Sequence, residues 1–153
     1  MKLARNHICV RHFLPGDEDA WRRMRFELWP DSDRADADAW AVRQDAVTLV
    51  AEDTNTTDLV GFAEVGERPY ADGCGTSPVA FLEGWFVLTE ARRSGIGSEL
   101  VHAAAAWAKN RNLQELASDS ILEDTAAYMA HLSAGFQEVE RSIKYRLLLP
   151  RFR

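Results

Sequence analysis

The stretch Arg92-Arg93-Ser94-Gly95-Ile96-Gly97 is the most informative part of this chain, because it joins an apolar, strand-like run to an alanine-rich segment typical of a helix. The apolar run ends at Leu88, and the helical segment begins at Ser98. Glycines let the backbone approach a ligand closely, since they lack a Cβ. A helix start offers unpaired N–H groups to an anion, and arginines add charge-assisted hydrogen bonds. The pattern R-x-x-G-x-G therefore predicts a cradle for a pyrophosphate.

The glycine spacing excludes two other phosphate motifs. A nucleoside triphosphate loop needs G-x-x-x-x-G-K-[ST], and a dinucleotide fingerprint needs G-x-G-x-x-G. Neither pattern occurs in the chain. The hexapeptide alone is also compatible with an ordinary loop that leads into a helix, so its context must decide.

Length and composition indicate one packed domain, residues 1–153. The chain has 153 residues, of which 46% are hydrophobic, and no low-complexity segment is present. No apolar stretch is long enough to cross a bilayer, and residues 1–11 lack the apolar core of a signal peptide. We therefore expect a cytoplasmic protein with no membrane partner.

Charged and metal-binding residues exclude two further classes. The net charge is −6 and no basic stripe is visible, which argues against a nucleic-acid partner but suits a cationic substrate. Cys9 and Cys74 lie far apart, and the four histidines are scattered, so no metal site is expected and the thiols are expected to be reduced.

Hydrophobic periodicity and turn residues predict a mixed α/β fold in the order β-α-α-β-β-β-α-β-α-β-β. The expected strands are residues 8–13, 47–52, 59–65, 79–88, 113–118, 136–140 and 142–149. The expected helices are a segment through Trp21 that Pro30 ends, then residues 31–44, 98–109 and 123–134, the last capped by Gly135.

R-x-x-G-x-G between a strand and a helix resembles motif A of the GCN5-related N-acetyltransferases (GNATs), which hold the pyrophosphate of acetyl-CoA with it. Further stretches resemble the aminoglycoside 6'-N-acetyltransferase branch of that family, and together they run from about Trp21 to Tyr145. They are Leu28-Trp29-Pro30, Thr76 to Gly84 (TSPVAFLEG), Phe86-Val87-Leu88, Ala117-Ser118-Asp119, Gly135-Phe136 and Glu140-Arg141. The resemblance implies a central mixed, mostly antiparallel sheet flanked by about four helices.

Three acidic residues are candidates for the acceptor site. Glu83 lies inside an apolar strand, where a carboxylate must be paired with an arginine, hydrated or open to a cleft. Asp119 follows the 113–118 strand, at a sheet edge where ligands often bind, although it could instead cap the next helix. Glu140 could be an ordinary surface residue at a strand end. The resemblance assigns all three to an aminoglycoside, with Trp29 and Tyr70 as walls, although Trp29 could equally be a core residue.

The resemblance also implies the acetyl-CoA site. Trp85, Phe86 and Val87 would lie along the pantetheine arm, paired with it like an added strand. The pyrophosphate would be surrounded by Arg92, Arg93, Ser94, Gly95, Ile96, Gly97 and Ser98.

Two positions depart from the family pattern. Asp124 stands where an asparagine often donates a hydrogen bond to the cofactor. His131 stands where many members carry a tyrosine acid, and Tyr128 is one turn earlier; His131 could protonate the leaving thiolate or simply pack on the helix face.

The expected reaction is direct attack by the 6'-amine on the thioester of acetyl-CoA, with both substrates bound together. Asp119 and Glu83 are the candidate proton acceptors, and a strand N–H near Phe86 or Val87 would stabilise the thioester oxygen. Acetylation would remove a positive charge from the antibiotic and so give resistance. The resemblance also implies a homodimer.

Two other functions remain open from the sequence. One is an N-acetyltransferase for another amine, a polyamine or a peptide N-terminus. The other is a non-catalytic acetyl-CoA sensor, which the substitutions at Asp124 and His131 would favour.

Overall fold

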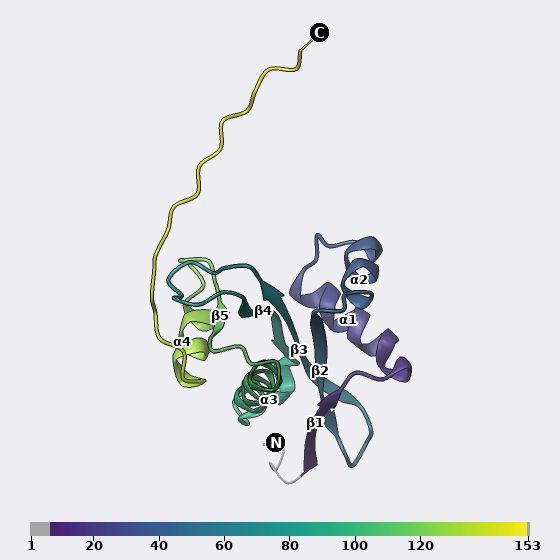
Figure 1. Cartoon of the computed structure of the whole chain (residues 1–153). Helices are drawn as coiled ribbons and strands as arrows, with labels where there is room; N and C mark the ends of the chain where they lie inside the picture. The colour runs from purple at the N-terminus through teal and green to yellow at the C-terminus, as the bar shows by residue number, and fades with distance from the viewer. Residues whose placement is uncertain (1–6, 153) are drawn as a thin grey trace.

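The computed structural model describes residues 7–152, which form one sheet with helices on both of its faces (Figure 1). Residues 1–6 lie outside the described residues. They include part of the segment, residues 1–11, for which the sequence predicts no signal peptide. Single turns of 3₁₀ helix occur at Pro15–Asp17 and Thr89–Ala91. The main elements are β1 (Ile8–His12), α1 (Glu18–Leu28), α2 (Arg34–Ala41), β2 (Ala46–Asp53), β3 (Leu59–Arg68), β4 (Val79–Val87), α3 (Ile96–Asn110), β5 (Leu116–Ser118) and α4 (Thr125–Ser133).

The strands follow one another across the sheet in the order β1-β2-β3-β4-β5. Each neighbouring pair is antiparallel except β4 and β5, which are parallel. Parallel neighbours need a crossover, and here α3 supplies it. The predicted fold class, a mixed, mostly antiparallel sheet with four helices, is confirmed.

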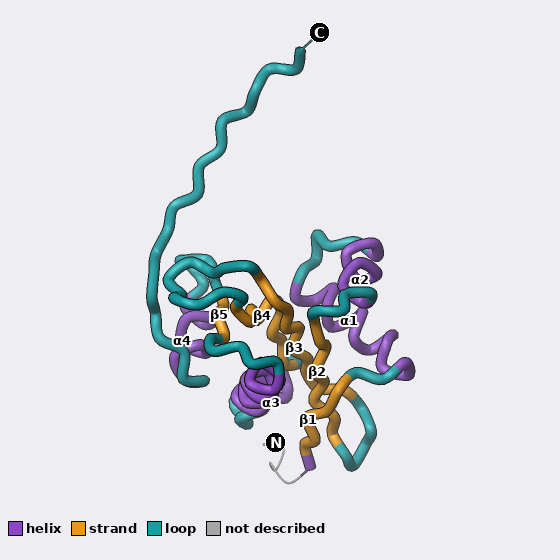
Figure 2. Tube along the Cα trace, viewed as in Figure 1, coloured by secondary structure: helices purple, strands orange, loops and turns teal. Residues whose placement is uncertain are grey.

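Two hydrophobic clusters hold the layers together, one on each face of the sheet. On one face Leu100 and Ala104 of α3 pack against Leu49 and Ala63 of the sheet. On the other face, Val50 and Phe62, which alternate with these residues in the strands, pack against Trp21 and Met24 of α1 and Trp40 of α2. The tube in Figure 2 shows the same arrangement, with the orange strands between purple helices.

A β-bulge interrupts the pairing of β3 with β4 at the centre of the sheet. Glu64 pairs with Gly84, but the next residue, Val65, pairs with Leu82, so no residue of β3 lies opposite Glu83 in the strand register. Bulges of this kind re-aim a side chain and are frequent beside active sites. The bulge therefore accounts for a charged residue in an otherwise apolar strand.

The prediction of two final strands, residues 136–140 and 142–149, is wrong. From Phe136 to Phe152 the chain has no helix or strand. Phe136 and Val139 still lie against the body, and beyond them the chain runs away from it as an extended tail (Figure 1). A strand needs a neighbour to accept and donate its backbone hydrogen bonds, and the tail has none within residues 7–152. Its apolar side chains are accordingly exposed, among them Ile143 (72%), Tyr145 (87%), Leu147 (85%) and Leu149 (75%).

Two helices are shorter than predicted, because acidic caps set where they begin. The expected helix 31–44 is α2, whose N-cap Asp33 accepts a hydrogen bond from the amide of Asp36 at 3.0 Å. The expected helix 123–134 is α4, whose N-cap is Asp124. Gly135 ends α4 with φ of 98°, as the sequence predicted.

Three further facts apply to the part of the chain that the structure covers. No helix there is both long enough and apolar enough to cross a membrane. No group of three His, Cys, Asp or Glu side chains among these residues is placed to hold a metal ion. Cys9 and Cys74 are both free thiols.

Candidate active site

Glu83, at the bulge of β4, forms a two-pronged ion pair with Arg68 at the end of β3. The Arg68 Nε and Nη2 groups donate to its two carboxylate oxygens at 2.7 and 2.6 Å. The guanidinium carbon of Arg68 also lies 3.5 Å from the ring centroid of Phe81. The structure thus has the arginine pair that the sequence left as an alternative. Because the Glu83 side chain stays 22% exposed, a ligand can still reach it.

Beside Glu83 lies a cavity of about 560 Å³ between α1, α2 and the strands β3 and β4. Its two cationic side chains are each neutralised by a carboxylate: Arg25 by Glu64, and Arg43 by Asp45. Glu83 is likewise paired with Arg68, so the charge that remains comes from Asp31 and Asp36 and favours a cationic ligand. The cavity is lined by Arg25, Trp29, Asp31, Ser32, Asp36, Trp40, Arg43, Glu64 and Glu83.

Asp119 comes directly after β5 and is exposed. No group within residues 7–152 donates a hydrogen bond to its carboxylate, and the helix cap that it might have formed is made by Asp124 instead. The pKa of Arg68 is raised, first by its hydrogen bond with Glu83 and also by the charge of Asp119. The charges of Asp119 and Glu83 therefore both act on Arg68, but only Glu83 forms hydrogen bonds with it.

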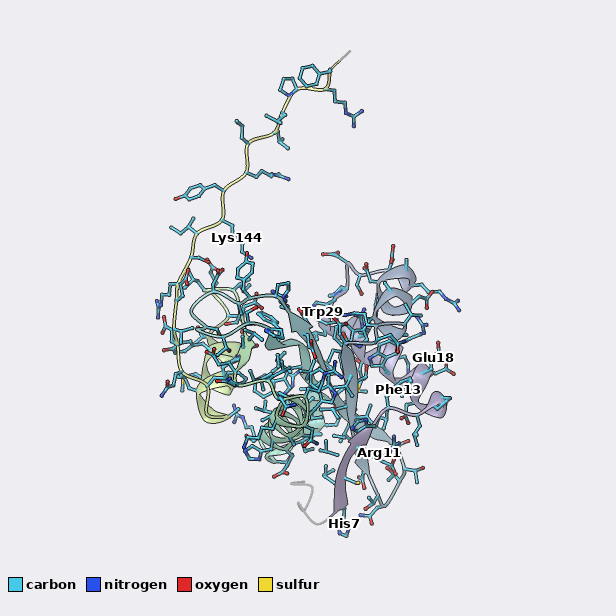
Figure 3. All side chains as sticks on the ribbon, in the orientation of Figure 1. His7, Arg11, Phe13, Glu18, Trp29 and Lys144 are labelled. Carbon is cyan, nitrogen blue, oxygen red and sulfur yellow. The ribbon has the colours of Figure 1, made fainter. Side chains whose placement is uncertain are left out.

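The other two acceptor-site candidates, Tyr70 and Glu140, do not line the cavity in the structure of one chain. Tyr70 is 71% exposed, just beyond the end of β3. Glu140 is exposed on the tail. Figure 3 shows Lys144 on the tail, well separated from Trp29 on the body. The structure thus gathers Trp29 and Glu83 in one cavity, brings Asp119 within electrostatic reach of Arg68, and leaves Tyr70 and Glu140 outside it.

The β5-facing edge of β4 is open over the residues predicted to bind a pantetheine arm. β5 pairs only with Ala80, Phe81 and Leu82, so residues 83–87 have no strand partner on that side within the described chain. Trp85 bridges to the next segment, since its Nε1 donates to the carbonyl of Gly97 at 3.1 Å. A Cβ on Gly97 would lie 3.1 Å from the Trp85 ring, so any side chain there would push the ring aside by a few tenths of an ångström.

The predicted phosphate cradle has the geometry of an anion site. Arg93 and Gly95 adopt φ values of 62° and 88°, and α3 begins at Ile96, slightly before the predicted Ser98. Within the described residues no oxygen accepts from the backbone N–H groups of residues 93–98. Such a run of free amides at a helix start binds anions.

Side chains around the cradle fix its shape. The Ser94 hydroxyl donates to the carbonyl of Ala91 at 2.5 Å, and Arg92 Nε donates to the carbonyl of Val87 at 2.8 Å. The guanidinium of Arg92 also lies over Phe86, 5.6 Å from its ring centroid. Arg93 and Ser98 form no side-chain hydrogen bond within residues 7–152, so both remain available for an anion.

Asp124 and His131, the two departures from the family pattern, both have structural partners. The Asp124 carboxylate accepts from the Ala127 amide at 2.9 Å and so caps α4. His131 Nε2 lies 2.8 Å from the Ser118 hydroxyl, and its Nδ1 lies 2.7 Å from the Ala127 carbonyl. Because a carbonyl only accepts, Nδ1 carries the proton and Nε2 faces Ser118. The ring also packs edge-on against Trp85 and Phe136.

Sequence reasoning missed Arg25, Glu64 and Arg68. Glu64 carried the same signal as Glu83, a carboxylate inside an apolar strand, and was overlooked. The spacing of Trp21, Arg25 and Trp29, four residues apart each time, would have placed them on one face of α1.

Comparison with known proteins gives a consistent result. Residues 17–136 match the model of the Acetyltransferase (GNAT) family. An aminoglycoside N(6')-acetyltransferase type 1 from Klebsiella aerogenes is 45% identical over 137 residues, covering 85% of this chain and 90% of that protein.

Solved structures agree with the sequence comparison. An aminoglycoside antibiotic 6'-N-acetyltransferase from Acinetobacter baumannii superposes with a TM-score of 0.85 at 33% identity, over 94% of this chain and 99% of that one. The enzyme AAC(6')-Iy, in complex with the bisubstrate analogue CoA-S-monomethyl-acetylneamine, gives the same TM-score, identity and coverage.

Proposed function

This chain belongs to the Acetyltransferase (GNAT) family, and on that premise we propose that it is an aminoglycoside 6'-N-acetyltransferase. It would transfer the acetyl group of acetyl-CoA to the 6'-amino group of an aminoglycoside antibiotic. The product carries an amide in place of a cationic amine, which would weaken antibiotic action and give resistance.

The observation that carries the proposal is the position of β4 between two sites. Trp85, on the open edge, contacts Gly97 in the first turn of α3, where the free amides lie, and the Glu83 bulge opens onto the acidic cavity. An acyl donor paired along residues 85–87 would therefore have its reactive end beside the acceptor. Holding both reactants in this way lowers the barrier by removing the cost of bringing them together.

The free amides and glycines of the motif A loop fit the pyrophosphate of acetyl-CoA, with Arg92 and Arg93 adding positive charge. The open edge of residues 85–87 offers backbone groups to the pantetheine arm, apart from the Val87 carbonyl, which already accepts from Arg92. Bound there, acetyl-CoA supplies a thioester as the acyl donor. Asp124 contributes no donor to it, since its carboxylate caps α4.

The proton of the attacking amine goes to Asp119, directly or through a water molecule. An amine attacks only when it is neutral, so a group must take its proton near the reaction centre. Asp119 has free oxygens, whereas both oxygens of Glu83 are held by Arg68. We therefore assign Glu83 to binding and orienting the cationic acceptor, and Asp119 to the proton transfer. Trp29 forms a wall of the same pocket, while Tyr70 and Glu140 are proposed to contact the acceptor only after movement of their segments.

A thiol-release assay tests the function. The purified chain is mixed with acetyl-CoA and kanamycin or tobramycin, and free coenzyme A is followed with a thiol reagent. Turnover with these compounds, and none with spermidine or a peptide N-terminus, supports the assignment. Turnover only with the polyamine or the peptide would replace it, and tight acetyl-CoA binding without any transfer would favour a sensor.

We also propose that the protein is a homodimer joined through its tail. Residues 143, 145, 147 and 149 are apolar and alternate with Lys144 and Arg146, which is the pattern of a strand with one buried face. β5 is an edge strand of the sheet, and edges of this kind can be extended by another chain. The exposed tail supports exchange between two copies, which would also bury its apolar residues.

Sedimentation at micromolar concentration tests the dimer with the full chain and a variant that ends at Ser142. The full chain is expected to sediment as a dimer and the shortened chain as a monomer. A full-length monomer would contradict the proposal, and a dimer without the tail would move the interface elsewhere.

A single domain of residues 1–153 and a cytoplasmic location complete the proposal. Two free cysteines support a reducing compartment.

A further inference from the structure

Glu64 is a fully buried carboxylate in the middle of β3, and its partners come from α1. Arg25 binds it with two hydrogen bonds, Nε to Oε1 at 2.6 Å and Nη2 to Oε2 at 3.0 Å. Trp21 Nε1 donates to the same Oε1 at 2.9 Å. Burial raises the pKa of Glu64, and the hydrogen bonds and charge of Arg25 oppose that rise.

Stability alone does not explain such a pair. The desolvation of two buried charges offsets most of their attraction, and apolar replacements of similar size are often neutral or stabilising. A buried ion pair beside a candidate site therefore calls for a functional explanation.

The pair leads directly to Trp29. The Arg25 guanidinium lies 4.7 Å from the centroid of the Trp29 ring, in stacking range. The backbone N–H of Trp29 also donates to the Arg25 carbonyl at 2.8 Å, which anchors Trp29 at the end of α1.

Gly84 lies against the edge of the six-membered part of the Trp29 indole. A Cβ at position 84 would lie 2.5 Å from Trp29 Cη2, closer than a non-bonded contact allows. The indole thus has a guanidinium over its ring and the bare backbone of Gly84 at its edge. Arg25, Trp29, Glu64 and Glu83 all line the same cavity.

Glu64 has a second effect on that cavity. An unpaired Arg25 would place a positive charge on the wall and repel an ammonium group, but Glu64 cancels this charge through contacts of 2.6 and 3.0 Å. The same carboxylate thus fixes the orientation of Arg25 and keeps the cavity suitable for a cation.

We propose that Arg25 and Glu64 are positioning residues that hold Trp29 as a rigid wall of the acceptor pocket, and that Gly84 sets the depth of that wall. This assignment rests on the proposed acetyltransferase function. It gives the two residues no contact with the reacting atoms, so their loss acts on acceptor binding and not on acetyl-CoA.

The test uses two perturbations of the wall. The first is the double variant Arg25→Met/Glu64→Gln, which removes both charges together, while the amide oxygen of the new side chain on β3 still accepts from Trp21. The second is Gly84→Ala, which displaces Trp29 without touching any charge. Both are expected to raise the KM for the aminoglycoside at least about fivefold and to leave the KM for acetyl-CoA within about twofold of the original, since a fivefold change corresponds to about 1 kcal/mol.

A matched control comes from a second stacked pair outside the cavity. Arg111 Nε contacts Glu67 Oε1 at 2.6 Å, and Arg111 lies 5.0 Å from the Trp107 ring centroid. Arg111→Met/Glu67→Gln should leave both KM values within about twofold. An unchanged acceptor KM in the folded Arg25/Glu64 and Gly84 variants would overturn the proposal, as would a control that behaves in the same way as they do.

A second readout needs no turnover. Acrylamide quenching of Trp29 emission, taken as the difference between each protein and its Trp29→Phe counterpart, reports how tightly the indole is held. Easier quenching in both wall variants supports the positioning role even if the original chain acetylates no aminoglycoside, in which case only the proposed function fails. Unchanged quenching of Trp29 would overturn the positioning role itself.

Discussion

Replacing Asp119 with asparagine should abolish most of the activity while leaving the fold intact. The variant keeps the shape of the side chain but removes the proton acceptor. General base catalysis contributes roughly 10²–10⁴-fold in rate, so the barrier should rise by about 2.7 to 5.4 kcal/mol. Because Asp119 is exposed and accepts no hydrogen bond within residues 7–152, its loss should change the free energy of unfolding by less than about 0.5 kcal/mol.

The assay is thiol release at saturating acetyl-CoA, with thermal unfolding measured on the same preparation. Asp58→Asn is the control, since Asp58 is also an exposed aspartate but lies in the turn between β2 and β3. The control should keep full activity. A kcat/KM for Asp119→Asn within about threefold of the original, far less than a lost general base costs, would show that another group takes the proton.

Three further perturbations probe the acceptor site, the cofactor site and the stability of the fold. Glu83→Gln should raise the acceptor KM about 10- to 100-fold, because a hydrogen bond to a charged group is worth about 1.5 to 3 kcal/mol. Steady-state kinetics measure this change, and an effect on the acetyl-CoA KM alone would contradict the prediction. Gly97→Ala should raise the acetyl-CoA KM about fivefold, because the new Cβ lies 3.1 Å from the Trp85 ring and overpacking costs about 1 kcal/mol or more. An unchanged acetyl-CoA KM would show that the ring can move freely. Asp17→Asn should remove part of the acid sensitivity. The pKa of Asp17 is lowered by the Arg11 hydrogen bond and then by the Leu14 amide, so its stabilisation is complete above the unfolded pKa of about 3.9 and is lost as the pH falls through the folded value. The two proteins should therefore differ in urea stability at about pH 7, and the difference should shrink as the pH falls below the unfolded pKa; a difference that stays constant would refute the assignment.

Local patterns in the sequence were sufficient to predict most of the fold. Periodicity located each strand and helix up to Gly135, because these elements bury one face against a partner within the same chain. Two helices begin a few residues after their predicted starts, because Asp33 and Asp124 act as their N-caps.

The tail shows where a pattern does not determine structure. The alternation around Tyr145 is that of a strand, yet a strand forms only when it pairs with a neighbouring edge, and within the described residues the tail pairs with none. The sequence contains the pattern but not the identity of the partner.

The candidate site was predictable only in part, for a similar reason. Glu83 and Trp29 were identified from their residue types and the family resemblance, but their partners depend on which strands and helices meet. The bulge that aims Glu83, and the pairing of Arg25 with Glu64 from 39 residues away, arise from tertiary contacts that no local spacing encodes.

The proposed transfer to the 6'-amine is tested most directly with two aminoglycosides that differ only in bearing an amine or a hydroxyl at the 6' position. Each is incubated with the full chain and acetyl-CoA, and the product is analysed by mass spectrometry and NMR. We expect one acetyl group on the 6' nitrogen of the amino compound and none on the hydroxyl compound. Acetylation of both compounds, or at another nitrogen, would contradict the proposed function.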